Sequence, residues 1–137
     1  LNLAYLGGTL YGANLSGADL ANANLSNANL SGVRSGGITG TPSALPVGWQ
    51  LINGYLVGPG ADLSGADLSS AELAGANLTD TNLNNANLSG VQSGSIIGTP
   101  AALPAGWQLI NGSLVEVALP LNGIYKGSNI NDKMGAQ

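Results

Sequence analysis

The chain has no cysteine, no histidine and no phenylalanine, and only 7% of its 137 residues are charged. Without cysteine there is no disulfide and no thiolate metal site, so the redox compartment cannot be inferred from cysteine usage. Without histidine and cysteine, the Ser-His-Asp and Cys-His nucleophile arrangements are excluded. Ordinary globular domains carry about 25% charged residues, so solubility here must rest on Asn, Ser, Thr and Gly.

Basic residues and long apolar runs are also scarce. Three basic residues against seven acidic ones give a net charge of −4, which argues against a nucleic-acid partner because such binding needs a basic surface. No apolar run reaches the roughly 18 residues needed to cross a membrane. The chain begins with Leu, already within repeat-like sequence, so we interpret it as processed or as a piece of a longer chain. Localisation stays open, with an extracellular or cell-surface site slightly favoured over the cytoplasm.

The sequence that is present is dominated by a five-residue period. Residues 61–90 form six consecutive units, each with a central Leu, a small residue two positions earlier and Asn, Asp or Glu between them. This period fits neither a helix nor a flat strand, but it fits a chain that bends every five residues. Side chains alternate along an extended segment, so the Leu and the small residue point inward. Eleven central leucines are predicted to form the core: Leu10, Leu15, Leu20, Leu25, Leu30, Leu63, Leu68, Leu73, Leu78, Leu83 and Leu88.

These units resemble the pentapeptide-repeat family, whose pattern is small–Asn/Asp–Leu/Phe–Ser/Thr–any. The resemblance implies an all-β fold, a right-handed quadrilateral parallel β-helix with about twenty residues per coil. It implies little about function, since a fold shared by many roles does not select one of them.

Between the regular blocks lies a longer repeat. Residues 28–57 and 86–115 align without gaps, and 24 of the 30 positions are identical. The chain is therefore divided into a solenoid of two long repeats, 1–115, and a non-repeat segment, 116–137. The solenoid carries inserts at about 33–60 and 91–115, each with a Pro-rich stretch that is predicted to leave the coil as a loop.

Each insert contains one tryptophan, Trp49 or Trp107, followed by an Asn-Gly pair that predicts a tight turn. We interpret each Trp as packing beneath its own proline loop, covering the side of the coil. The alternative is an exposed stacking platform for a carbohydrate or a partner.

The acidic residues do not form a catalytic or metal-binding group. Asp62, Asp67 and Glu72 are five apart, so they are predicted on successive faces of the coil, pointing outward and away from one another. A carboxylate pair needs two acids at one place. We therefore predict no catalytic, cofactor-binding or metal residue, no cofactor, and no enzymatic activity.

After residue 115 the period of five is lost. Residues 115–121 alternate apolar and other side chains, which predicts a strand with one apolar face, formed by Val115, Val117, Leu119 and Leu121. We expect this segment either to cap its own solenoid or to pack against the N-terminal coil of another copy. The hypothesis is a structural solenoid that associates with itself end to end, into a filament or a larger scaffold. The alternatives are a DNA-mimicking, gyrase-binding member of the family, or a glycan- or ligand-binding solenoid surface.

Overall fold

The computed structural model describes residues 9–117, and these contain strands, bridges and turns but no helix. Four short strands form two hairpins: β1 (Gln50–Ile52) pairs antiparallel with β2 (Tyr55–Val57), and β3 (Trp107–Ile110) with β4 (Ser113–Glu116). This part of the chain is therefore all-β, as the sequence predicts. Among the described residues no helix is long and apolar enough to cross a membrane.

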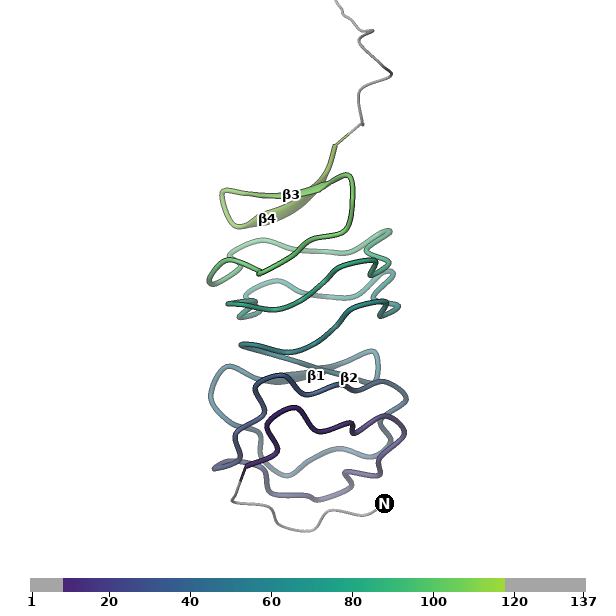
Figure 1. Ribbon diagram of the computed structural model, residues 1–137, viewed down its shortest axis with the longest axis vertical. Coiled ribbons are helices and arrows are strands. Elements are labelled where there is room, and N and C mark those ends of the chain that lie inside the picture. The colour runs from purple at the N-terminus through teal and green to yellow at the C-terminus, as the bar shows by residue number, and fades with distance from the viewer. Residues whose placement is uncertain (1–8, 118–137) are drawn as a thin grey trace, which may run out of the picture.

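The remaining backbone pairs in parallel with the stretch of chain that lies beside it. Isolated bridges join residues twenty apart, such as Asp19 with Thr39 and Asp62 with Asn82. In Figure 1 these stretches, which we call coils, lie one above another along the long axis of the molecule. One bridge, between Arg34 and Asp62, spans twenty-eight residues because the β1–β2 hairpin is inserted between its partners.

Each coil bends at intervals of five residues through tight turns. The N–H of Ala18 donates to the carbonyl of Leu15 at 3.0 Å, and the same bond recurs from Ala66 to Leu63 at 3.0 Å. The third residue of these turns has a left-handed backbone, as at Gly17 with φ 74°. This geometry is that of a type II turn, which favours glycine at that position. The Ser-Gly dipeptides of the sequence therefore form the bends.

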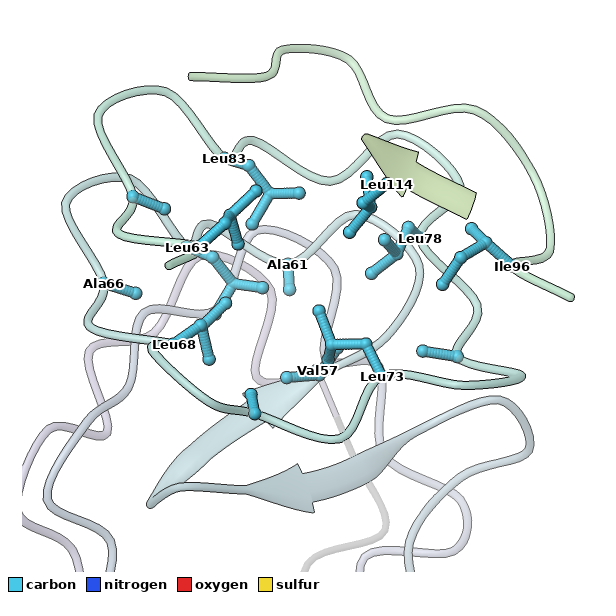
Figure 2. Close-up of a cluster of buried hydrophobic side chains, with 14 residues drawn as sticks. Val57, Ala61, Leu63, Ala66, Leu68, Leu73, Leu78, Leu83, Ile96 and Leu114 are labelled. Carbon is cyan, nitrogen blue, oxygen red and sulfur yellow. The ribbon is translucent and has the colours of Figure 1, made fainter. Parts of the chain in front are cut away.

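The central leucines face the interior of the coils. Leu10 is half-buried, and the other ten predicted core leucines are buried: Leu15, Leu20, Leu25, Leu30, Leu63, Leu68, Leu73, Leu78, Leu83 and Leu88. Figure 2 shows the upper group of these side chains converging within the coils. Burying a leucine side chain contributes about 1.5–3 kcal/mol, so the row of leucines is the main source of stability.

The proline-rich stretches remain in the coil further than the sequence predicts. Ala44 bridges in parallel to Asn24, twenty residues earlier, and Ala102 bridges in the same way to Asn82. The prediction that each Pro-rich stretch leaves the coil as a loop is therefore wrong for the first half of the stretch. The reason is that Ala44 lies between two prolines and supplies the backbone groups itself: its carbonyl accepts from the N–H of Leu25 at 2.9 Å. The chain departs only beyond that residue, toward the hairpin.

Candidate functional site

The β1–β2 hairpin separates two apolar clusters. Leu56 belongs to the cluster of the first coils, whereas its neighbour Val57 belongs to the cluster formed by the coils after residue 60. Adjacent residues of a strand point to opposite faces, so the hairpin presents one apolar face to each cluster. It is continuous with the core rather than attached to its side.

Trp49 links the two clusters. Its half-buried side chain packs against both of them. Its ring lies against Gly58, where any Cβ would overlap the indole. Trp107, the equivalent residue, packs against one cluster only, and the residue matching Gly58 is Glu116, which pairs with Trp107 across the second hairpin. Both tryptophans are half-buried and pack against the core.

Hydrogen bonds connect the first hairpin to the coils on both sides of it. The N–H of Leu56 donates to Ser35 Oγ at 2.8 Å. On the other side, the N–H of Asp67 donates to Tyr55 Oη at 3.1 Å, and Asn53 Nδ2 donates to the Ser69 carbonyl at 3.3 Å. Asn53 and Gly54, both with positive φ, close the turn, as the Asn-Gly pair predicts.

The β3–β4 hairpin makes the same hydrogen bond to the coil that precedes it as the first hairpin does. Leu114 is buried against the core, and its N–H donates to Ser93 Oγ at 2.8 Å. Its opposite face differs, because Val115 is 36% exposed and Ile110 is 43% exposed, whereas Val57 is 1% exposed. Within residues 9–117 the last strand begins at Ser113 and ends at Glu116. Most of the strand expected over 115–121 lies outside the described residues.

Of the other residues predicted to take part in assembly, only Val117 lies within the described residues 9–117. The N–H of Val117 donates to the carbonyl of Gly106 at 2.7 Å, and its side chain is half-buried. Leu119 and Leu121 lie outside the described residues.

The acidic residues lie on separate faces of the coils. Asp62, Asp67 and Glu72 each bridge to an uncharged residue of the following coil: Asn82, Asn87 and Gln92. Within residues 9–117 no group of three His, Cys, Asp or Glu side chains is positioned to hold a metal ion. These three acidic residues therefore do not form a vertical acidic row.

Sequence reasoning missed the partner of Asp62. Arg34 Nη1 lies 3.2 Å from Asp62 Oδ2, since the two residues stack directly although the hairpin separates them along the chain. The hydroxyl of Ser64 donates to the carboxylate of Asp62 at 2.7 Å. This bond is the main reason that the pKa of Asp62 is lowered, with the N–H of Ser64 and the charge of Arg34 adding to it and burial opposing it.

The outward Asn and Asp residues also have a structural role that the five-residue pattern did not reveal. Each accepts a hydrogen bond at its Oδ1 from the N–H two residues later, as in Ser16 to Asn14 at 3.0 Å and Ser69 to Asp67 at 3.1 Å. These are Asx turns, which fix the backbone at a bend. The signal was the consistent Asn or Asp immediately before each Leu. Local hydrogen bonding thus explains these side chains without a ligand.

Comparison with known proteins identifies one family. A model described as pentapeptide repeats matches residues 7–34 and 60–92, with eight copies. No curated protein matches the chain, and no solved structure matches it. The two matched segments are the regular blocks, and both hairpins fall outside them.

Proposed function

Because this chain belongs to the pentapeptide-repeat family, we propose that it is a non-enzymatic structural β-solenoid that associates with further copies end to end. The observation that carries the proposal is the continuity of its apolar core. The core extends from the first described coil, where Leu10 is half-buried, to the β3–β4 hairpin, whose outer side exposes Ile110 and Val115. Apolar side chains left partly open at both ends of residues 9–117 favour further stacking.

The detailed architecture that we propose is a right-handed, four-sided parallel β-helix. Parallel bridges between residues twenty apart, together with bends five residues apart, support four sides per coil. At about 4.8 Å per coil, such a stack is short for a scaffold that acts alone. Residues 1–115 would form this solenoid as two long repeats, and residues 116–137 would be a separate segment without the repeat.

In this assembly the two ends have different surfaces. Contacts between unlike surfaces do not close on themselves unless the rotation generates a ring, so they propagate into a filament. The low charge of the chain supports this arrangement, since only seven acidic and three basic residues are present to oppose stacking.

Gyrase binding by DNA mimicry is disfavoured by the charge distribution. A mimic of duplex DNA needs acidic side chains in continuous rows. Here Asp67 stacks on Asn87 and Glu72 on Gln92, while Asp62 is paired with Arg34. We expect no effect of the purified chain on gyrase supercoiling. Inhibition or protection that is lost when Asp62, Asp67 and Glu72 are changed to Asn or Gln would replace the structural proposal.

Light scattering across a range of protein concentrations, together with electron microscopy, tests self-association. The expected result is a mean mass that rises with concentration, accompanied by rods whose width matches a single solenoid. A constant monomer mass at every concentration would contradict the proposal.

A further inference from the structure

The outer face of the β3–β4 hairpin is an apolar surface that the described chain leaves uncovered. We define it by the side chains on one side of the hairpin: Gln108, Ile110, Ser113 and Val115. In the register of the pair, Ile110 lies opposite Ser113 and Gln108 opposite Val115, and residues directly opposite share a face. Ile110 and Val115 are exposed, whereas Leu109 and Leu114 pack against the core on the other side.

The first hairpin provides an internal example of how such a face is covered. The equivalent apolar residues, Ile52 and Val57, pack in the cluster that contains Ala61, Leu63 and Leu73. These cluster partners come from the coil that follows the hairpin (Figure 2). A hairpin face of nearly the same sequence therefore binds a coil made of pentapeptide units.

The residues that follow the second hairpin lack the sequence of such a coil. Aligned with the first repeat, they supply Leu121 at one central position. At the next three, where the first repeat has leucine, they have Lys126, Asn131 and Ala136. A lysine and an asparagine inside the coil would be buried without partners, which is unfavourable. The segment 118–137 is thus poorly suited to cover the outer face as a pentapeptide coil.

The first described coil, residues 9–28, does have the required sequence. It carries a central leucine in each unit, preceded by a small residue. Part of its lower side is open within the described chain: Leu10 and Ala13 are half-buried, although the other inward residues of this coil are buried, among them Leu15, Ala18, Leu20, Ala23 and Leu25.

The backbone hydrogen bonds also indicate that this lower side is an open edge within residues 9–117. In the next coil, the N–H of Arg34 donates to the carbonyl of Ala13 at 2.9 Å and that of Thr39 to Ala18 at 3.0 Å. The matching amides of the first coil, at Asn14 and Asp19, have no acceptor among residues 9–117. A strand edge of this kind readily pairs with another chain.

We propose that the outer face of the β3–β4 hairpin binds the first coil, residues 9–28, of a second copy of this chain. The inference rests on the proposed function and specifies its contact: the joint between two molecules repeats the junction between the two halves of one molecule. Two contacts of the internal junction are missing at this joint, because Ser113 replaces Tyr55 and Gln92 replaces Arg34. The joint is therefore weaker than the internal junction and forms reversibly.

Sedimentation velocity tests the contact by comparing the association of three full-length variants. Two of them carry two substitutions and one carries a single substitution. Replacing Ile110 and Val115 together by Lys places two unpaired charges in the joint, and we expect association at least about tenfold weaker. The control is Ile97→Lys, which changes a residue 54% exposed on the side of the stack and should leave association unchanged. The third variant carries Leu119→Lys and Leu121→Lys and should also associate normally. Circular dichroism melts establish that each variant is folded.

The outcomes separate the two proposals. If the unmodified chain never associates, the proposed function fails and this contact fails with it. If the unmodified chain associates and the Ile110/Val115 variant does so equally well, the contact alone is overturned. Loss of association only in the Leu119/Leu121 variant would likewise overturn it, in favour of a joint made by residues 116–137.

Disulfide trapping identifies the occupant directly, because the chain has no cysteine of its own. One preparation carries Val115→Cys and the other carries Ala13→Cys, at a half-buried inward position of the first coil. We expect rapid formation of the mixed disulfide when the two are combined. Predominant 115–115 dimers would instead indicate a two-fold joint between identical faces and would overturn the proposal.

Discussion

The two hairpins differ in exposure although their sequences are nearly identical. Val57 in β2 and Val115 in β4 occupy the same place in the long repeat, yet the first is buried and the second is exposed. The first hairpin lies between two stacked clusters, and among the described residues the second contacts only the cluster below it. Burial in this molecule is therefore decided by the neighbouring coil as well as by the residue.

The largest expected effect comes from the cluster that both hairpins share. Leu73→Ala or Leu78→Ala should lower the free energy of unfolding by about 2–5 kcal/mol, because each leaves a cavity in a narrow core. Glu72→Asn, on the adjacent outward position, should change it by less than about 0.5 kcal/mol. Urea denaturation measures both, and equal losses would refute the assignment of inward and outward residues.

The next effect concerns Trp49 and the position beneath its ring. Gly58→Ala forces a Cβ into the indole, and we expect a loss of about 1–3 kcal/mol from overpacking. Glu116→Ala, at the equivalent position of the second hairpin, should change stability by less than about 0.5 kcal/mol. Thermal melts with tryptophan fluorescence follow both. Similar small effects would mean that the two tryptophans pack in the same way.

The equivalent valines Val57 and Val115 show how much a covering coil adds to the free energy of unfolding. Val57→Ala should cost about 1.5 kcal/mol, since it removes two buried carbon atoms at about 0.8 kcal/mol each. Val115→Ala should cost less than about 0.5 kcal/mol at dilute concentration. Unfolding at increasing protein concentration then sharpens the comparison, because the cost at Val115 rises if a second copy covers it. A large cost at Val115 in the dilute monomer would indicate that another part of its own chain covers this side chain.

The smallest effect is electrostatic. It concerns the ion pair between Arg34 and Asp62, which the second long repeat lacks because Gln92 replaces the arginine. The folded-state pKa of Asp62 is lowered from 3.8, chiefly by the Ser64 hydroxyl, so its contribution is present above that value and is lost as the pH falls through the lower, folded pKa. Arg34→Gln, which introduces the residue found at the equivalent position 92, should cost less than about 1 kcal/mol, because the Arg34 side chain is 58% exposed. Its effect should shrink at high salt. Chemical denaturation between pH 7 and pH 2 tests this, and an effect that grows with salt would contradict it.

Much of the regular structure was predictable because its causes are local. A leucine every five residues specifies which side chains face inward, and the Ser-Gly and Asn-Gly pairs specify bends and hairpin turns through their positive φ. The bridges from Asp62, Asp67 and Glu72 to residues twenty positions later agree with the coil length that the family resemblance implies. The Arg34–Asp62 pair was not predictable, because an inserted hairpin changes that interval by an amount that composition does not specify.

By itself, the sequence determined the five-residue period, the row of inward leucines, the two-copy organisation and the absence of His- or Cys-based chemistry. Only the tertiary structure decided that the prolines stay within the coil as far as Ala44, and that Trp49 joins two clusters while Trp107 contacts one. It also decided that Val57 is covered and Val115 is exposed. The physical reason is that bends and side-chain alternation depend on adjacent residues, whereas burial depends on which coil is stacked above, and that partner is set by the path of the whole chain.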